Sequence, residues 1–409
     1  MSLNNISIHF FTIVLNGEPF IRYHIEVFRN LPFRWHWHIV EGVAKRVKDS
    51  TCPKGKSIDQ FHDKGHSKDG TLSYIQNLAS EYPGNITLYI KNDDQLFWNG
   101  HLEMVSAPLK NIQEECLLWQ IDVDEFWTID QIIRTRNLFI THPEKTAAYY
   151  WCLFFVSPQL VITTRNCYAQ NPKFEWLRTW RFTPGLRWES HAPPRLVETH
   201  SDGRICDLAY INPFLHHETE KENLVFQHFA YFIPKQIEFK ASYYGYLNVE
   251  KWIELQKQTI FPVLLKDYFN WVDDETMVNT VHACGIKPLI SINPSGNIIF
   301  DYSFRGSEDY DKHIFENVID RTLEMHQLDE LIRIIESIES SKIWKIRSLL
   351  MKLLGRKVLK LSEYLSSIED ESIEKRFTEI HLYLKKIKES NCWKIWQKWV
   401  NFKRSIQHF

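Results

Sequence analysis

Three carboxylates lie within four residues in the segment Leu-Leu-Trp-Gln-Ile-Asp-Val-Asp-Glu-Phe-Trp, directly after an apolar run of strand length (117–127). Carboxylates placed where a buried strand reaches the surface are costly unless a cation neutralises them. In an extended chain, the side chains of Asp122 and Asp124 point to one side and that of Glu125 points to the other. The spacing therefore predicts that Asp122 and Asp124 converge on one metal ion.

The expected ion is Mn²⁺ or Mg²⁺, because these hard cations accept one or two carboxylates and complete their coordination with water and substrate phosphates. An Asp-x-Asp pair at a strand end therefore indicates a phosphorylated ligand. A structural alternative stays open, in which Asp124 or Thr128 caps a helix over 130–138.

Strands and helices alternate in the sequence that leads to these carboxylates. The β-rich runs 6–15 and 35–40 flank a predicted helix at 20–29, and a helix over 72–82 precedes a strand at 86–91. A helix from residue 99 then leads to the strand that ends at Asp122. Four strands alternating with helices predict an α/β sheet over 6–127, with its first two strands parallel.

The carboxyl ends of the strands in such a sheet form the rim where ligands bind. Leu15 and Asn16 follow the first strand and Glu41 ends the second, so we expect these three residues near Asp122 and Asp124. The polar stretch 44–69, which lacks periodicity, is predicted to be a mobile loop.

Three sequence fragments at these strand ends resemble nucleotide-sugar glycosyltransferases of the GT-A type. They are Ile-Val-Leu-Asn-Gly-Glu (13–18), Val-Glu-Gly (40–42) and above all Trp-Gln-Ile-Asp-Val-Asp-Glu-Phe-Trp (119–127). The similarity is greatest to bacterial family 2-like enzymes and the related β-1,4-N-acetylglucosaminyltransferases, and it extends over residues 6–246. The resemblance implies a Rossmann-like nucleotide-binding half and a mixed sheet flanked by helices.

The resemblance also implies roles for individual residues. Asp122 and Asp124 would hold Mn²⁺ or Mg²⁺ against a nucleoside diphosphate sugar, and Leu15, Asn16 and Glu41, together with Asp122, would bind the nucleotide part.

A histidine well after the Asp-x-Asp motif often returns as a further metal ligand in GT-A enzymes, and His228 lies where the resemblance expects it. Its apolar strand also fits a hydrogen-bonded core histidine. Lys235 and Lys240 follow on a predicted helix and could bind the diphosphate as point charges. A solvated helix face is the alternative for both lysines.

An inverting transferase of this type needs a base that takes the proton of the acceptor hydroxyl. Glu189, in the polar turn 189–195, is the first candidate, and Asp207 is the second. An ion pair of Glu189 with Arg187 or Arg195 is the structural alternative. A retaining enzyme would need no such base, and the sequence leaves the two outcomes open.

The acceptor half is predicted to continue with further strands and helices. These are a β-hairpin over 147–156 and 160–164, strands at 176–182 and 186–188, helices over 243–268 and 275–284, and a hairpin over 290–302.

Beyond residue 311 the chain is rich in helix-forming residues. The stretch 342–360 contains seven basic and no acidic residues among apolar ones, which is typical of a basic amphipathic helix at an anionic membrane surface. A second stretch, 385–404, has Trp393, Trp396, Trp399 and Phe402 at a spacing of three. Packing against the rest of the chain is the alternative for both stretches.

The composition bears on the partners and the compartment of the protein. Acids and bases nearly balance at a net charge of −2, which argues against nucleic acid as a partner. The seven cysteines show no Cys-x-x-Cys pair, no run reaches the ~18 apolar residues of a membrane span, and no basic segment precedes the first apolar run. We therefore expect a cytoplasmic protein. The basic helix adds the expectation that it binds peripherally at the inner face of a membrane.

These observations predict a GT-A-like domain over 1–310, with a nucleotide-sugar half at 1–127 and an acceptor half at 128–310, followed by a helical region at 311–409. The predicted activity is metal-dependent transfer of a sugar from a nucleoside diphosphate sugar to a hydroxyl of a glycan or lipid-linked acceptor. Two alternatives stay open. One is a metal-dependent nucleotidyltransferase or phosphohydrolase, and the other is a non-catalytic sugar- or lipid-binding protein on the same fold.

Overall fold

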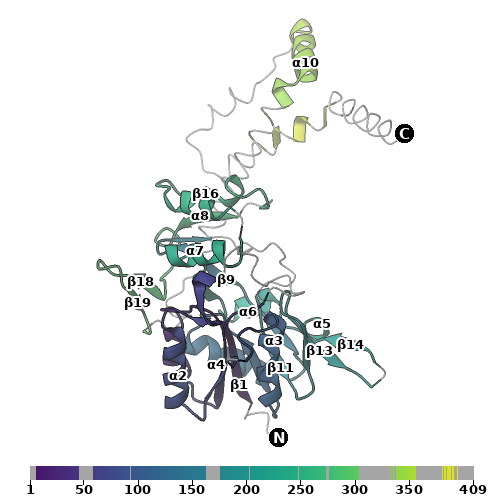
Figure 1. Cartoon of the computed structure of the whole chain (residues 1–409). Coiled ribbons are helices and arrows are strands. Elements are labelled where there is room, and N and C mark those ends of the chain that lie inside the picture. The colour runs from purple at the N-terminus through teal and green to yellow at the C-terminus, as the bar shows by residue number, and fades with distance from the viewer. Residues whose placement is uncertain are drawn as a thin grey trace. The chain divides into compact units, whose positions relative to one another are not determined.

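The computed structural model describes most of the chain up to residue 303 and parts of the remainder. The described residues are 6–45, 59–92, 94–162, 176–201, 203–246, 248–272, 276–303, 332, 335, 338–355, 380, 382–383, 385–387, 389–390 and 394. The chain divides into two compact units, Met1–Phe315 and Glu316–Phe409 (Figure 1). Each unit has a buried hydrophobic cluster of its own.

The first unit contains a mixed six-stranded sheet in the order β5-β2-β1-β6-β11-β8. Four of its strands run parallel, namely β1 (Ser7–Val14), β2 (Trp35–Glu41), β5 (Ile86–Tyr89) and β6 (Cys116–Gln120). β11 (Leu177–Phe182) is antiparallel to β6, and β8 (Ala147–Tyr149) is antiparallel to β11. β1 is almost entirely buried, as expected for an apolar run in the interior of a sheet covered on both faces.

Helices flank the sheet (Figure 1). The parallel strands are connected by α1 (Arg22–Phe28), α2 (Thr71–Glu81) and α3 (His101–Ser106) with the 3₁₀ turn η3 (Pro108–Asn111), and α4 (Ile129–Thr141) leads from β7 (Glu125–Phe126) to β8. Thr128 caps α4 by accepting a hydrogen bond from the Gln131 backbone N–H, and the Gln131 side chain accepts one from the Thr128 N–H. The predicted α/β fold class, a mixed sheet flanked by helices, is confirmed.

A second six-stranded sheet has the order β16-β17-β10-β9-β15-β7. Its strands are β7 (Glu125–Phe126), β9 (Cys152–Ser157), β10 (Leu160–Ile162), β15 (Phe226–His228), β16 (Val263–Leu264) and β17 (Met277–Thr280). β7 follows β6 after a four-residue turn, so the chain passes from the first sheet to the second at the carboxylate segment. β7 pairs with β15 and sets His228 opposite Glu125.

Smaller elements complete this unit. They are η2 (Asp59–Phe61), β3 (His62–Asp63), β4 (His66–Ser67), β12 (Arg187–Ser190), β13 (Arg195–Thr199), β14 (Ile205–Asp207), α5 (Leu208–Ile211), α6 (His216–Lys221), α7 (Pro234–Ser242), α8 (Val249–Gln256), η4 (Leu265–Asp267), β18 (Ile290–Ile292) and β19 (Ile298–Phe300). β18 and β19 form the hairpin predicted over 290–302. Of the hairpin predicted over 147–156 and 160–164, β9 and β10 form the observed part, whereas 147–149 form the separate strand β8 of the first sheet.

Three sequence predictions differ from the observed elements. The helix predicted over 275–284 is wrong, because Met277–Thr280 forms strand β17 between β10 and β16, with Met277 and Val278 buried. The helix predicted over 243–268 is limited to α8, followed by β16 and η4. The loop predicted over 44–69 contains η2 and the β3–β4 hairpin, and its residues 46–58 lie outside the described part.

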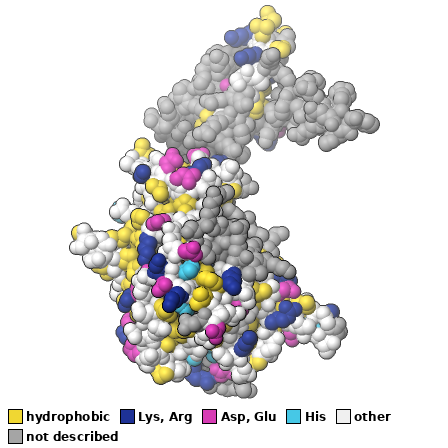
Figure 2. Space-filling model, in the orientation of Figure 1, with side chains coloured by type: hydrophobic (Ala, Val, Ile, Leu, Met, Phe, Trp, Pro, Cys, Tyr) yellow, Lys and Arg dark blue, Asp and Glu magenta, His cyan; other side chains and the backbone are white. Residues whose placement is uncertain are grey.

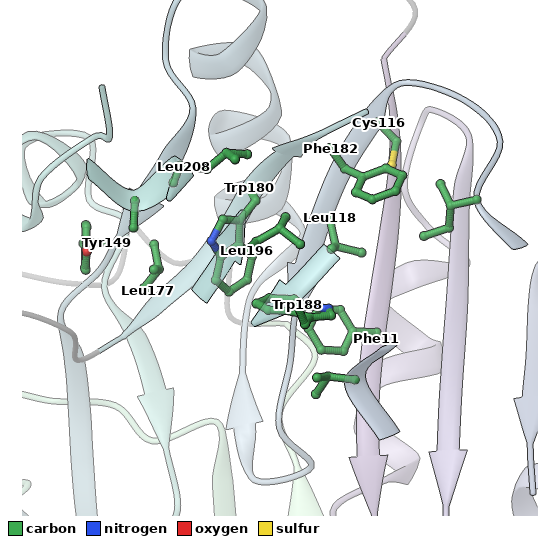
Figure 3. Close-up of a cluster of buried hydrophobic side chains, with 14 residues drawn as sticks. Phe11, Cys116, Leu118, Tyr149, Leu177, Trp180, Phe182, Trp188, Leu196 and Leu208 are labelled. Carbon is green, nitrogen blue, oxygen red and sulfur yellow. The ribbon is translucent and has the colours of Figure 1, made fainter. Parts of the chain in front are cut away.

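A buried aromatic and aliphatic cluster joins the first sheet to the small β12-β13-β14 sheet (Figure 3). Phe11 and Leu118 contribute from β1 and β6, and Trp180 from β11 packs edge-on against Trp188 of β12, with ring centroids 5.0 Å apart. Leu196 of β13 lies among them. This packing holds β6 in place, and the carboxylate turn begins directly after the end of β6.

Three histidines form a stack across neighbouring strands. His9 of β1 lies within 2.9 Å of His38 of β2 (Nδ1 to Nε2), and the His36 ring is centred 4.5 Å from that of His38. Tyr89 Oη lies 2.9 Å from His38 Nδ1, and Glu114 contacts His9 at 3.4 Å. Burial, with the neighbouring imidazoles adding to it, lowers the pKa of His38 to about 2 and that of His36 to about 4.

We expect acidification to destabilise the first unit through this stack. His38 is neutral in the folded state, whereas the unfolded chain binds a proton below pH ~6.5. The free energy of unfolding therefore falls as the pH drops below that value, by about 2 kcal/mol for His38 alone at pH 5. Urea midpoints at pH 7 and pH 5 measure the loss. His38→Gln should lose less on acidification, and an equal loss in both proteins would show that His38 is not responsible.

The second unit has a small core around α10 (Lys342–Leu353). Trp344 is buried there with Ile335, Ile380 and Ile387, and Tyr383 donates a 2.6 Å hydrogen bond to Glu339. The predicted stripe of Trp393, Trp396, Trp399 and Phe402 lies outside the described residues. No helix in the described segments has the length and apolar character needed to span a bilayer.

Candidate active site at the ends of β1 and β6

The carboxylates predicted to act together lie on a turn rather than on an extended strand. The Glu125 N–H donates a 3.0 Å hydrogen bond to the Asp122 carbonyl, which closes the turn between β6 and β7. Asp122 and Asp124 nevertheless line the same cavity, and the Glu125 side chain is fully buried away from solvent. The two aspartates thus share a cavity because the chain turns, not because it is extended.

Contacts from three elements hold this turn in place. The Val123 carbonyl lies 3.0 Å from His24 Nε2 of α1, and the Asp124 carbonyl accepts a 2.8 Å hydrogen bond from the Phe229 N–H. Gly17 allows the end of β1 to approach the turn, because a Cβ there would lie 2.7 Å from a Val14 methyl and 3.1 Å from a Val123 methyl. The β1 end and the carboxylate turn are therefore packed as one rim.

The cavity at this rim has a volume of about 740 Å³. One wall consists of the β1 end from Ile13 to Glu18 and the carboxylate turn, and α7 supplies the facing lysines. Other lining residues are Phe20, Phe61, His101, Gln120, Trp176, Arg178, His191, Ala192, Pro193, Pro194, His228, Ile233, Lys235, Gln236, Glu238, Phe239, Lys240, Tyr244 and Tyr246. In the space-filling view, acidic, basic and histidine side chains gather on the face where α7 lies (Figure 2).

Asp124 has cationic and polar partners on both carboxylate oxygens. Oδ1 lies 3.3 Å from His228 Nε2, and Oδ2 lies 3.4 Å from Lys240 Nζ and 3.5 Å from Gln236 Nε2. Burial alone would raise the pKa of the Asp124 carboxyl, but Lys240 and His228 hold it well below its usual value. Asp124 is therefore ionised throughout the neutral range.

A buried arginine that the sequence analysis missed neutralises the other two carboxylates. Arg178 of β11 donates from Nε to both Glu125 oxygens, at 2.9 and 3.0 Å, and its Nη2 lies 3.4 Å from Asp122 Oδ2. Burial would lower the pKa of Arg178, but the charges of Glu125 and Asp122 outweigh it and raise that pKa. The strand 177–182 has the sequence Leu-Arg-Thr-Trp-Arg-Phe, and its two arginines lie among buried residues. The sequence gives no sign of which arginine is buried against an acid, so it offered only a weak signal for Arg178.

Three of the four predicted nucleotide-binding residues at the strand ends line the cavity, and the fourth lies behind them. Leu15, Asn16 and Asp122 line the cavity, whereas Glu41 does not. The fully buried Glu41 side chain accepts hydrogen bonds from the Ser67 N–H at 2.7 Å and from His66 Nδ1 at 2.8 Å. The Ser67 hydroxyl in turn accepts the Asn16 N–H at 2.9 Å, so Glu41 positions Asn16 instead of meeting a ligand itself.

Asn16 occupies the left-handed backbone region, with a φ of 57°, which asparagine tolerates better than most residues. Its side chain donates to the Phe61 carbonyl at 2.6 Å and accepts the Lys68 N–H at 2.8 Å. Both side-chain groups are thus used to fasten the β3–β4 region to the rim.

The two predicted lysines lie on one helix but differ in their surroundings. Lys240 is mostly buried beside Asp124, with its Nζ 4.9 Å from the centre of the Tyr231 ring. Lys235 is 60% exposed, and its Nζ lies 3.7 Å from Asp69. Lys235 is therefore the freer of the two to reach an anion in the cavity.

The two predicted bases do not line the cavity. Glu189 forms a 2.7 Å ion pair with Arg195, which is the structural alternative that the sequence left open. Asp207 contacts the same arginine at 3.2 Å and caps α5 through the Ala209 N–H. The turn that follows Glu189 does line the cavity, through His191 and Ala192–Pro194, although Glu189 itself pairs with Arg195 of β13.

The donor set at Asp124 fits a divalent cation with few protein ligands. In the described part of the chain, no three histidine, cysteine or carboxylate side chains cluster closely enough to hold an ion. The 3.3 Å between Asp124 Oδ1 and His228 Nε2, however, is close to the ~3 Å expected between adjacent ligands of an octahedral ion. Among the described residues, the buried Nδ1 of His228 also has no hydrogen-bond partner. Phosphate and water oxygens would complete such a site.

Comparisons with known proteins give only a coarse likeness. No protein-family model and no curated protein sequence matches the chain. Among solved structures, TarS of S. aureus is similar to this chain at 11% sequence identity and a TM-score of 0.27 in each of two crystal structures. The matched part covers 43% of this chain, and 47% of the shorter (TarS 1–349) and 28% of the longer TarS structure. The function is therefore argued from the cavity itself.

Proposed function

We propose that this protein is a metal-dependent glycosyltransferase that moves a sugar from a nucleoside diphosphate sugar to a hydroxyl of a glycan or lipid-linked acceptor. The observation that carries the proposal is one cavity lined both by Asp122 and Asp124 and by Lys235 and Lys240. It lies at the carboxyl ends of the adjacent parallel strands β1 and β6, where open α/β sheets bind ligands.

The mixture of charges in this cavity selects the class of ligand. Ionised Asp124 repels a bare anion, and the lysines and Arg178 repel a bare cation. A diphosphate bound together with a divalent cation satisfies both sets of side chains, because the lysines bind phosphate oxygens and the carboxylates bind the cation. When bound at Asp124 and His228, with Asp122 beside them, Mn²⁺ or Mg²⁺ would supply positive charge to the leaving diphosphate.

Different residues of the cavity would bind the nucleoside and the diphosphate of the donor. The β1 end, with Leu15 and Asn16, provides the wall for the nucleoside, and Lys235 and Lys240 provide positive charge for the diphosphate. Breaking the glycosidic bond increases the negative charge on the diphosphate, so fixed cations stabilise the transition state more than the ground state. Lys240 already lies 3.4 Å from Asp124 and is thereby held in the cavity.

The aromatic lining of the cavity suits a carbohydrate acceptor. Trp176, Tyr244 and Tyr246 line the cavity, and aromatic rings pack against the apolar faces of sugar rings. His191 is the titratable group that the 191–194 turn presents to the cavity, with its ring centred 5.1 Å from that of His101. For an inverting reaction, we assign to His191, in place of Glu189 and Asp207, the role of the base that takes the proton of the acceptor hydroxyl.

A panel of nucleoside diphosphate sugars, incubated with the full chain and glycan acceptors with and without Mn²⁺, tests the proposal. We expect one donor to be consumed with release of its nucleoside diphosphate, and EDTA to stop the reaction. Release of a sugar 1-phosphate with transfer of the nucleoside monophosphate group to an acceptor would instead identify a nucleotidyltransferase. Release of free nucleoside monophosphate or of inorganic phosphate would identify a phosphohydrolase. Saturable sugar binding without consumption of any donor would identify a binding protein.

A further inference from the structure

The helix α10 has two apolar faces with different environments. Trp344 is 7% exposed and belongs to the core of the second unit with Ile335 and Ile380. Ile346, Leu349, Leu353 and the following Leu354 are instead 58%, 62%, 76% and 71% exposed. At ~100° per residue, Ile346, Leu349 and Leu353 form one stripe on the side of the helix opposite Trp344. The helix therefore packs with one face and leaves a second apolar face in solvent.

Basic side chains border the exposed stripe. Lys345 and Lys352 are both exposed and lie seven residues apart, so they project along the same edge of the stripe. Arg347 faces the other way, with its guanidinium 4.2 Å from the centre of the Trp344 ring. Hydrophobic and basic side chains are visible together on α10 (Figure 2). The sequence 342–360 contains no acidic residue that could offset them.

We propose that this α10 face, made of Ile346, Leu349, Leu353, Leu354, Lys345 and Lys352, binds an anionic lipid bilayer at the depth of the headgroups. A helix lying in that plane buries its apolar stripe at the boundary with the acyl chains and keeps its lysines at the lipid phosphates. Anionic lipids attract the exposed lysines, and the acyl boundary accepts the exposed leucines, so the surface fits both kinds of side chain.

The charge pattern argues against a second copy of the chain as the occupant. A symmetric dimer through the α10 face would bring Lys345 and Lys352 of one copy toward the same lysines of the other. Like charges placed together oppose such a contact, whereas anionic lipids neutralise them. The proposal concerns the surface at which the protein works and is independent of the activity assigned to the cavity.

Co-sedimentation of the full chain with vesicles tests it. We expect the protein to pellet with phosphatidylcholine vesicles that contain 30% phosphatidylglycerol at low salt, to be released as the salt concentration rises, and to stay in solution with pure phosphatidylcholine. Failure to pellet with the anionic vesicles at low salt would overturn the proposal, whatever the outcome of the nucleotide-sugar assay.

Two variants connect the binding to the α10 face. Leu349→Glu/Leu353→Glu should abolish pelleting, and Lys345→Gln/Lys352→Gln should weaken partitioning by roughly 30-fold, as expected for the loss of two lysines near an anionic surface. The controls are Leu382→Glu, at an exposed leucine elsewhere in this unit, and Lys257→Gln in the first unit, with folding checked by circular dichroism. If both double variants pellet like the controls, or if light scattering shows a wild-type dimer that Leu349→Glu/Leu353→Glu dissociates without any vesicle binding, the proposal is wrong.

Discussion

Asp124→Asn is expected to reduce the rate of glycosyl transfer by at least ~100-fold while the protein stays folded. The carboxylate lies between Lys240 and His228 and is ionised at neutral pH. Asparagine keeps the shape but removes the charge that holds these groups and that, in the proposed reaction, would hold a divalent cation at the leaving diphosphate. Losing a metal-binding charge costs several kcal/mol of transition-state stabilisation, which corresponds to rate losses of ~100- to 1,000-fold.

The control must separate catalysis from stability. Because its partners keep the folded-state pKa of Asp124 low, its carboxylate stabilises the fold above the unfolded pKa of ~3.9, and this contribution is lost as the pH falls below it. Asp124→Asn should therefore also cost about 1–3 kcal/mol of stability at pH 7. Asp130 pairs with Arg134 at a distance of 3.4 Å and does not line the cavity. Asp130→Asn should therefore change neither the transfer rate nor the stability much. Transfer by Asp124→Asn at the rate of Asp130→Asn would remove Asp124 from the mechanism.

Arg178→Met is expected to destabilise the first unit by about 3–5 kcal/mol, because it leaves the fully buried Glu125 without its cation. Burial raises the pKa of the Glu125 carboxyl even with Arg178 in place, so the unpaired carboxylate would be still more costly. The loss should appear in urea unfolding followed by tryptophan fluorescence.

A second substitution shows whether the missing charge is the cause. Arg178→Met/Glu125→Gln removes both members of the buried pair and should recover much of the loss, since a neutral amide costs less to bury than an unpaired carboxylate. Arg134→Met, at a half-exposed pair one helical turn apart, should cost less than about 1 kcal/mol. If Arg178→Met costs no more than Arg134→Met, the Arg178–Glu125 pair does not support the site.

The parallel core of the first sheet was predictable because local signals agree there. The strands at β1, β2, β5 and β6 are apolar runs separated by helices, and each strand ends at a polar or turn residue. The rim position of Asn16 and Asp122 follows from that topology alone. The strand β17 was missed because it lies between β16 and β10, and its pairing with β10 joins segments 115 or more residues apart, which no local pattern encodes.

Side-chain roles that depend on contacts between distant segments were harder to predict. Glu189 was predicted to act as a base from its polar turn, but the antiparallel pairing of β12 with β13 brings Arg195 within 2.7 Å. Glu41 was predicted to meet the nucleotide from its strand-end position, but the β3–β4 hairpin covers it. A rim position sets which residues come near a ligand, and the neighbouring loops decide which of them reach it.

The boundary predicted between two functional halves at residue 127 does not coincide with a structural division. β8 and β11, from beyond that residue, complete the first sheet, and β7, from before it, belongs to the second. Arg178 links the two sheets, because it extends from β11 of the first sheet to pair with Glu125 of β7 and with Asp122 of the turn. The two sheets therefore build the cavity jointly.

Calorimetric titration with a nucleoside diphosphate tests the central claim most directly, because binding is measured without knowledge of the sugar or the acceptor. Uridine, guanosine and thymidine diphosphates are titrated into the wild-type chain and into Asp124→Asn, each with Mn²⁺ and with EDTA. We expect one of them to bind the wild-type protein at least ~10-fold more tightly with Mn²⁺ than with EDTA, and this difference to vanish in Asp124→Asn. Binding of none of the three, or binding that neither Mn²⁺ nor the substitution changes, would contradict a metal-assisted diphosphate site at Asp124.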